Sequence, residues 1–185
     1  MSNAFKSVSY AVVPHVLINV IGIDSKNLVF EFPMLVDSDE MTDEQRAQIV
    51  RDVFASEHET IMISHGTSTM VKTAKALYEY QNRSDATPED KKKKLVLVGS
   101  MRPYCLKEND VQENLRAAYK YALNAESGVH IAAPNGIFSD PYKVRKNLPA
   151  LRFEAIGRNS NPPPSDPVQE IPSSDSTGPD IRAIG

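Results

Sequence analysis

The sequence predicts an α/β fold in which a parallel β-sheet carries helices on both of its faces. Two short segments, TIMI (60–63) and LVLV (95–98), are apolar throughout, as strands buried on both faces are. Segments with apolar residues at helical spacing, at 69–82 and 110–125, alternate with them along the chain. This alternation is typical of parallel sheets with helical crossovers, and 185 residues suffice for one domain with a sizeable core.

The remaining elements follow the same alternation. Residues 29–36 (VFEFPMLV) and 129–133 (VHIAA) are predicted strands, and 82–88 is predicted to be a loop. Thr42 and Gln45 have the spacing of a capping box, which indicates that a helix begins there. The apolar face of that helix carries four residues: Ile49, Val50, Val53 and Phe54.

The apolar run at 8–23, VSYAVVPHVLINVIGI, is predicted to be a core strand, or a strand and a turn, rather than a membrane span. Pro14, His15 and Asn19 interrupt the run, and it is shorter than the roughly 20 apolar residues that a span needs. No small-residue cleavage site of a signal peptide follows it clearly. We therefore expect a cytoplasmic protein that does not act on membranes.

Composition changes near residue 158 and divides the chain into a domain (1–157) and a tail (158–185). Six of the thirteen prolines lie between 162 and 179, mixed with Ser, Asp, Asn and Gly. Such a segment cannot bury enough apolar surface to offset the entropy lost on ordering. We expect the tail to be disordered.

Charge, motifs and cysteine content argue against several classes of function. There are 21 Lys and Arg against 24 Asp and Glu, so the net charge is −3 and no general basic field attracts nucleic acid. Neither GxxxxGK[ST] nor GxGxxG is present, which leaves nucleotide binding weakly supported. Cys105 is the single cysteine, which excludes a disulfide within the chain and a metal site built on paired cysteines.

Polar side chains follow four of the predicted strands at the point where each ends. The four turns are Asp37-Ser38, Ser64-His65-Gly66-Thr67, Gly99-Ser100-Met101-Arg102 and Pro134-Asn135-Gly136. In a parallel sheet these turns converge on the carboxyl edge, where open α/β proteins bind ligands. We expect a small-molecule crevice there, built from hydroxyls, backbone amides and an arginine.

Structural roles compete with ligand binding at each of these positions. The hydroxyls of Thr67, Ser68 and Thr69 could cap the following helix, and His65 is expected to hydrogen-bond within its own turn. The other candidates have similar alternatives: a plain turn residue for Ser38, an ion pair with Glu108 or Asp110 for Arg102, and a solvated cation for Lys146. The residues alone leave these alternatives open.

Five segments, in order and at characteristic spacing, match the motifs of one enzyme family. They are DSDEMTDEQR (37–46), ISHGTSTMVKTAKAL (63–77), LVLVGSMRPY (95–104), ENDVQENL (108–115) and NGIFSDPYKVRKN (135–147). Together they resemble the bacterial-type L-asparaginase/glutaminase family, and most of all its short, single-domain asparaginase-like proteins. The resemblance implies a flavodoxin-like (Rossmann-like) fold, and hydrolysis of the side-chain amide of asparagine or glutamine through a covalent acyl-enzyme. It implies neither a metal nor an organic cofactor.

The resemblance also assigns roles to particular residues. Thr67 corresponds to the second of the family's two threonines, in its HGTDT motif, and Lys146 corresponds to the lysine that works with it. Substrate binding falls to the turns around them, at Asp37, Ser38, Gly66, Ser68 and Ser100. The chemistry agrees with these roles, because a threonine hydroxyl is a poor nucleophile until a base takes its proton. A lysine amine can be that base where burial or nearby cations favour its neutral form.

Two features depart from the family pattern. Ser68 stands where the family has the Asp of HGTDT, so a charged contact to the substrate's ammonium group is lost. The family's TGGTI motif, which carries the first threonine, is not found upstream of Asp37. The nearest echo is Gly22-Ile23-Asp24-Ser25-Lys26, in which Ser25 is the alternative nucleophile. We therefore expect the first strand and its nucleophile to be missing.

A missing central strand has consequences for stability and for function. An unpaired strand edge would have to be covered, so we expect low stability or association into a homo-oligomer. The segment HVLINVI (15–21) is the candidate to occupy the vacant place. The expected function is an asparaginase-type amidohydrolase with impaired chemistry. The alternatives are a non-catalytic module that binds a small amino acid, or a degenerate pseudoenzyme on the same fold.

Overall fold

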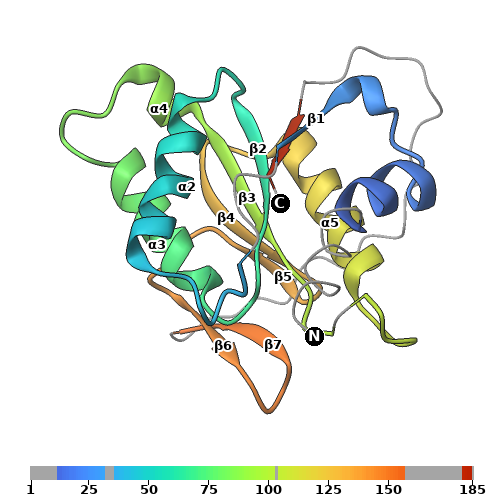
Figure 1. Cartoon of the computed structure of the whole chain (residues 1–185). Helices are drawn as coiled ribbons and strands as arrows, with labels where there is room; N and C mark the ends of the chain where they lie inside the picture. Colours follow the sequence, from blue (N-terminus) through green and yellow to red (C-terminus); the bar gives the residue numbers. More distant parts are fainter. Residues whose placement is uncertain (1–11, 32–35, 103, 157–180, 185) are drawn as a thin grey trace.

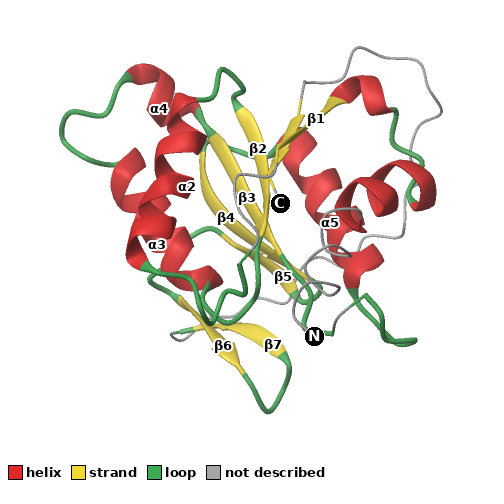
Figure 2. Ribbon diagram, viewed as in Figure 1, coloured by secondary structure: helices red, strands yellow, loops and turns green. Residues whose placement is uncertain are grey.

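The computed structural model describes residues 12–31, 36–102, 104–156 and 181–184. A six-stranded sheet stands between two layers of helices, and a two-stranded hairpin projects from one end (Figure 1). The strand order is β1-β8-β2-β3-β4-β5, and every neighbouring pair is parallel except β4 with β5. The expected α/β fold, with a mostly parallel sheet and helices on both faces, is confirmed (Figure 2).

The elements have the following bounds. The sheet contains β1 (Leu28–Glu31), β2 (Thr60–Ser64), β3 (Lys94–Val98), β4 (Gly128–Ala133), β5 (Gly136–Phe138) and β8 (Ile181–Ile184), and the hairpin consists of β6 (Val144–Asn147) and β7 (Arg152–Ala155). The helices are α2 (Asp43–Ala55), α3 (Met70–Gln81), α4 (Pro88–Lys92) and α5 (Val111–Asn124). Residues 12–15 are α-helical and continue into the π-helix η1 (Val16–Val20), and the 3-10 helix η2 (Ser25–Asn27) leads into β1.

Two apolar cores fill the spaces between the sheet and its helices. Side chains alternate across a strand, so Ile61 and Ile63 of β2 face α2 and α3, whereas Met62 faces α5 and η1. All three are at most 1% exposed. Burial on both faces explains why β2 is apolar from Ile61 to Ile63 and β3 from Leu95 to Val98. Each such side chain contributes roughly 1.5–3 kcal/mol relative to an exposed one.

The start of α2 shows the capping box that the sequence predicts. The backbone N–H of Gln45 donates to the Thr42 hydroxyl at 3.3 Å, and the Thr42 N–H donates to the Gln45 side-chain oxygen at 2.9 Å. Two N–H groups without a helical partner are thereby satisfied. This cap fixes where α2 begins, directly after the Asp37-Ser38 turn.

The strand β8 comes from the far end of the chain and pairs with both β1 and β2. Ile181 is in register with Leu28 on one side and Thr60 on the other, and both pairings are parallel. These four residues belong to the segment from 158 that was expected to be a disordered tail, and here the structure differs from that expectation. The rest of that segment, up to residue 180, lies outside the described residues.

The expectation for the apolar run at 8–23 is wrong over its described part. Residues 12–20 are helical rather than extended, and Val16 and Leu17 are fully buried against α5. The segment HVLINVI (15–21) therefore does not occupy a place in the sheet. A short, mostly apolar run is compatible with a packed helix as well as with a strand, and here the helix covers the face of the sheet beside α5.

Candidate active site

The turn between β2 and α3 lies at the carboxyl edge of the sheet and rests on the Asp37-Ser38 turn. A side chain at Gly66 would overlap the Ser38 hydroxyl, so glycine is what allows the two turns to touch. The Thr69 hydroxyl donates to the Ser38 carbonyl at 2.7 Å. Thr69 is the N-cap of α3 but makes no side-chain capping bond, so capping does not account for its hydroxyl.

Thr67 and Lys146 meet at this edge. The Lys146 Nζ donates a hydrogen bond to the Thr67 Oγ1 at 2.8 Å. Thr67 is buried, Lys146 is half-buried, and the Thr67 methyl group packs beside Gly99 at the end of β3. Lys146 is therefore not the solvated cation of the structural alternative. An amine and a hydroxyl at this distance can exchange a proton directly.

The β6–β7 hairpin brings Lys146 to Thr67. Lys146 is paired in register with Phe153, whose side chain is 2% exposed and anchors the hairpin in the core shared with Val144. The Asn135 side chain, from the turn after β4, donates to the Phe153 carbonyl at 2.6 Å. Because side chains alternate along β6, Lys146 lies on the same face as the buried Val144.

The cations that flank Lys146 in sequence are engaged elsewhere. Lys143 pairs with Asp140 at 3.2 Å, and Arg145 pairs with Glu154 at 3.5 Å. Both cationic side chains are at least two-thirds exposed. Their charges are therefore matched by carboxylates and screened by solvent, and neither lies in the contact between Lys146 and Thr67.

The turn after β3 is held in place by Asp110. Its carboxylate accepts hydrogen bonds from the backbone N–H groups of Met101 and Arg102, each at 3.0 Å. The Arg102 guanidinium pairs with Glu108 at 3.6 Å, which is the structural alternative weighed for it. Ser100 follows Gly99 in the chain and is half-buried.

The remaining site residues that the sequence suggested lie at opposite edges of the sheet. Asp37 and Ser68 are exposed at the carboxyl edge, where Asp37 also accepts the Asp39 N–H at 3.0 Å. Ser25 lies in η2, before β1 begins, and therefore at the amino edge. This position separates Ser25 from Thr67 by the length of a strand, and Ser25 is not the missing nucleophile.

The sequence did not reveal a hydrogen-bond network that lies next to the Gly66-Thr67 turn and joins three residues, His65, Thr73 and Arg46. His65 accepts or donates at both ring nitrogens, to Gly66 and to Thr73, and Thr73 is in turn bound by Arg46. The expectation that His65 hydrogen-bonds within its turn is confirmed. Burial lowers the pKa of His65, and the nearby Arg46 charge lowers it further. The signal for Arg46 was its place on the apolar stripe of α2, one turn before Ile49 and Val50.

Other types of site find little support in the part of the chain that the structure describes. There, no group of three or more His, Cys, Asp or Glu side chains is arranged to hold a metal ion. Within the same residues, no helix has both the length and the apolar character needed to cross a bilayer. A cavity of about 510 Å³ lies between α2 and α3, and neither Thr67 nor Lys146 lines it.

Comparisons with known proteins point to one family. The family model described as "Asparaginase, N-terminal" matches residues 2–171. The L-asparaginase of Thermococcus kodakarensis is 33% identical over 127 residues, which cover 68% of this chain and 34% of that protein. This chain thus spans about a third of the length of that relative.

Solved structures give the same result. The thermostable L-asparaginase from Thermococcus kodakarensis superposes with a TM-score of 0.56 at 29% identity, over 70% of this chain and 38% of that chain. A probable cytoplasmic L-asparaginase from Campylobacter jejuni superposes with a TM-score of 0.59 at 27% identity. That match covers 80% of this chain and 44% of the other.

Proposed function

The chain belongs to the asparaginase family, whose N-terminal domain it matches over residues 2–171. On this basis we propose that it hydrolyses the side-chain amide of L-asparagine or L-glutamine. The products are the free acid and ammonia. The observation that supports this function best is the 2.8 Å hydrogen bond between Lys146 Nζ and Thr67 Oγ1. This contact supports the proposal because an amine lies beside a hydroxyl at the edge of the sheet where open α/β proteins bind ligands, and the proposed reaction needs a base beside its nucleophile.

The proposed reaction uses Thr67 as the nucleophile. Lys146, as the free amine, takes the hydroxyl proton while Oγ1 bonds to the amide carbon. The carbonyl oxygen becomes an oxyanion, which backbone N–H groups of the Gly66-Thr67 turn stabilise. When the tetrahedral intermediate collapses, the C–N bond breaks, and the proton on Lys146 leaves with ammonia. A water molecule then attacks the ester, and Lys146 again accepts and returns a proton.

The amino-acid end of the substrate is assigned to the surrounding turns. We propose that Ser38, Ser68 and Ser100 supply hydroxyls, that Asp37 meets the ammonium group, and that Gly66 keeps the approach open. Ser68 is neutral, so it forms no ion pair with the ammonium group. We therefore expect weaker binding of amino acids than an aspartate at this position would give.

The partner and the location are part of the same proposal. We propose that a second copy of this chain closes the site in a homo-oligomer. We also place the protein in the cytoplasm, which is supported by the similarity to the probable cytoplasmic L-asparaginase.

A second candidate function is ligand binding without turnover. The replacement of the family's Asp by Ser68 and the absence of TGGTI support it, because both changes remove catalytic groups and leave the crevice. In this case a bound amino acid would stabilise the protein and no ammonia would be released.

Ammonia release from L-asparagine and L-glutamine tests the proposed function. We expect release by the wild-type chain and by Thr67→Ser, which keeps a hydroxyl, and none by Thr67→Ala. Thermal unfolding with and without L-aspartate is measured on the same samples. Stabilisation by L-aspartate without any ammonia release would contradict the proposed hydrolysis and support ligand binding without turnover.

A further inference from the structure

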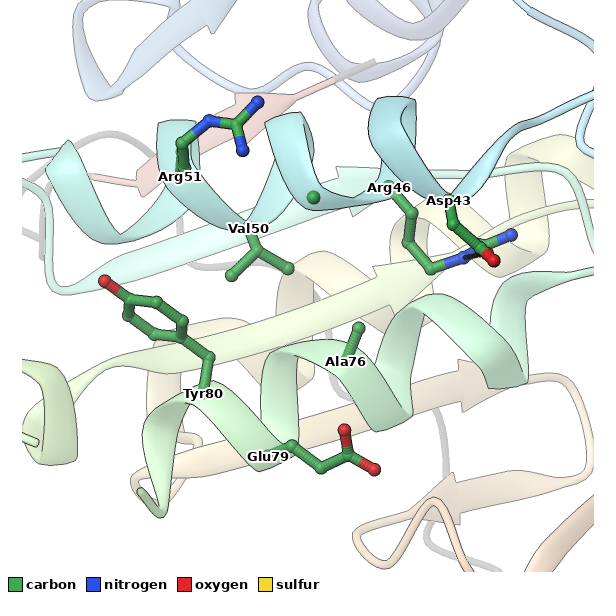
Figure 3. Close-up of a pocket in the computed structure, with 8 residues that line it drawn as sticks. Asp43, Arg46, Val50, Arg51, Ala76, Glu79 and Tyr80 are labelled. Carbon is green, nitrogen blue, oxygen red and sulfur yellow. Dashed lines mark ion pairs between the residues drawn. The ribbon is translucent and has the colours of Figure 1, made fainter. Parts of the chain in front are cut away.

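Arg46 occupies an unusual place for an arginine, on the buried face of α2. It is 6% exposed and extends into the space between α2 and α3 (Figure 3). Its Nη1 donates to the Thr73 hydroxyl at 2.5 Å, and its Nε lies 3.7 Å from the exposed carboxylate of Asp43. Burying a guanidinium group is costly unless its N–H groups are bonded. The hydrogen bond to Thr73 therefore offsets part of the cost of burying the Arg46 guanidinium group.

This contact sets the direction of a chain of hydrogen bonds. A guanidinium group has donors only, so the Thr73 oxygen must accept from Arg46. The single hydroxyl proton of Thr73 is then free for the His65 Nε2, at 2.8 Å. The sulfur of Met41, at 4.0 Å, is a weaker and more distant acceptor. Thr73 is fully buried, so bulk water does not compete for the proton.

The tautomer of His65 follows from this direction. Because Nε2 accepts the Thr73 proton, the ring proton of the neutral imidazole must be on Nδ1. The Gly66 carbonyl, 2.7 Å from Nδ1, can only accept a hydrogen bond, so it requires the same tautomer. The ring is 7% exposed, and the charged side chain that acts on it is Arg46, from α2. Thr73, from α3, is neutral. Both burial and the Arg46 charge lower the pKa of His65, in agreement with a neutral ring.

The chain of hydrogen bonds ends on the peptide that joins Gly66 to Thr67. In a trans peptide the carbonyl and the N–H point in opposite directions, and no described peptide bond is cis. Since His65 holds the Gly66 carbonyl on its own side, the Thr67 N–H points to the other side. Thr67 also carries the hydroxyl that Lys146 contacts. The orientation of this peptide therefore affects both the nucleophile and a donor to the oxyanion.

We propose that Arg46 is a positioning residue, which through Thr73 reinforces the His65 tautomer that the Gly66 carbonyl requires and thereby holds the Gly66-Thr67 peptide in its orientation. It touches no substrate in this account. The catalytic part of the inference rests on the proposed function. The structural part, from Arg46 to the His65 ring, does not depend on any activity.

Nitrogen-15 NMR of the histidine rings in the full chain tests the structural part. The chain has four histidines, and His65→Gln assigns the signal of interest. We expect a neutral His65 ring with its proton on Nδ1 at pH 7. In Arg46→Met, Thr73 is no longer required to donate and only the Gly66 carbonyl still favours the proton on Nδ1. The Nε2 signal should therefore lose the effect of the hydrogen bond from Thr73, and both ring signals should shift part of the way towards averaged tautomers. Arg46→Lys, which also only donates, should keep the wild-type pattern.

A matched control and a second variant keep the test decisive. Arg51→Met removes an exposed arginine from the same helix and should leave the His65 signals unchanged. Thr73→Val, with nearly the same shape, should have the same effect as Arg46→Met, whereas Thr73→Ser should restore the wild-type signals. A proton on Nε2 in the wild type, or unchanged signals in both Arg46→Met and Thr73→Val, would overturn the proposal.

Steady-state ammonia release tests the catalytic part. We expect Arg46→Met to lower kcat about 10- to 100-fold with little change in KM, as a small displacement of a reacting group does. Arg46→Lys should recover most of this loss. An altered tautomer with unchanged kcat would overturn the positioning role. A wild-type chain without ammonia release would refute the proposed function, while the NMR result would still decide the structural part.

Discussion

Lys146 and Thr67 lie 79 positions apart in sequence, and the Lys146 amine nevertheless contacts the Thr67 hydroxyl at 2.8 Å. Two different elements produce this contact, the turn between β2 and α3 and the β6–β7 hairpin. The Thr67 methyl group packs beside Gly99 at the end of β3, and the buried Phe153 anchors the hairpin that carries Lys146. The geometry of the proposed catalytic pair is thus a property of the whole fold.

Ser68→Asp should improve the binding of amino-acid amides. Ser68 is exposed at the carboxyl edge, so a carboxylate there can meet the substrate's ammonium group without being buried. A charge-assisted hydrogen bond contributes about 1.5–3 kcal/mol, which corresponds to roughly a 10- to 100-fold lower KM or Kd. Isothermal titration with L-aspartate measures the effect. Ser68→Asn is the neutral control, and equal affinities for the two variants would contradict the assignment of Ser68.

Ala183→Pro should destabilise the chain. Position 183 is in the middle of β8, which pairs with β1 on one side and β2 on the other. Proline removes a backbone donor, and the partner left without a hydrogen bond costs about 1–3 kcal/mol. Urea unfolding followed by circular dichroism measures the loss. An unchanged midpoint would mean that β8 adds nothing to the stability of the sheet.

Stability should fall as the pH drops below about 6.5. Burial lowers the pKa of His65 and of His130 in the folded state, so the unfolded chain binds these protons first. The stabilisation is complete above the unfolded pKa and is lost as the pH falls through the folded values. The slope is at most about 1.4 kcal/mol per pH unit for each histidine.

Urea unfolding at pH 7.5, 6.5 and 5.5 measures this dependence. The ordinary titration of Asp and Glu lies lower, so it contributes little in this interval. His65→Gln should reduce the pH dependence of the unfolding free energy by the contribution of one histidine. A free energy of unfolding that stays constant from pH 7.5 to 5.5 in the wild type would contradict the buried, neutral state of both rings.

Phe153→Ala should detach the hairpin as well as weaken the core. The Phe153 ring is 2% exposed, and such a truncation costs roughly 3–5 kcal/mol. Because Phe153 is paired in register with Lys146, ammonia release should fall more steeply than stability alone explains. Leu148→Ala, at a site that is 64% exposed on the same hairpin, should change the unfolding free energy by less than about 0.5 kcal/mol. Equal effects of the two substitutions on activity would refute the anchoring role.

Local patterns predicted much of the sheet and its helices. The apolar segments at 60–63 and 95–98 are strands β2 and β3, and the helical spacing at 69–82 and 110–125 corresponds to α3 and α5. The capping box at Thr42 was visible in sequence because its two residues are only three positions apart. Such patterns can be recognised in the sequence because the interactions that produce them join residues close together in the chain.

Non-local interactions explain what the sequence did not show. The strand β8 is four residues long, and its partners β1 and β2 lie more than a hundred residues away. Its short sequence carries no periodicity that could have revealed it among prolines and serines. The helix at 12–20 was taken for a strand because it is apolar on most sides. The hairpin β6–β7 is otherwise polar, and its two buried side chains, Val144 and Phe153, lie one on each strand, so neither strand shows an alternating pattern.

Part of the candidate site could be predicted from the sequence, because the topology of a parallel sheet determines where certain turns lie. Turns after parallel strands converge, so Ser38, Thr67 and Ser100 could be placed at one edge. The Asp110 contacts to the turn after β3, and the network from Arg46 to His65, join separate elements and need coordinates to be seen. Of these residues, Arg46 is the one for which the sequence holds a signal, because it lies one turn before Ile49 and Val50 on the apolar face of α2.

The most direct test of the central claim compares two lysines of the same segment. Lys146→Met removes the amine that contacts Thr67, whereas Lys143→Met removes an exposed amine paired with Asp140. Ammonia release from L-asparagine is measured for both variants and the wild type. We predict a loss of about 100- to 10,000-fold for Lys146→Met, as for removal of a general base, and near wild-type activity for Lys143→Met. Equal activity of the two variants would contradict the proposed role of the Thr67–Lys146 pair.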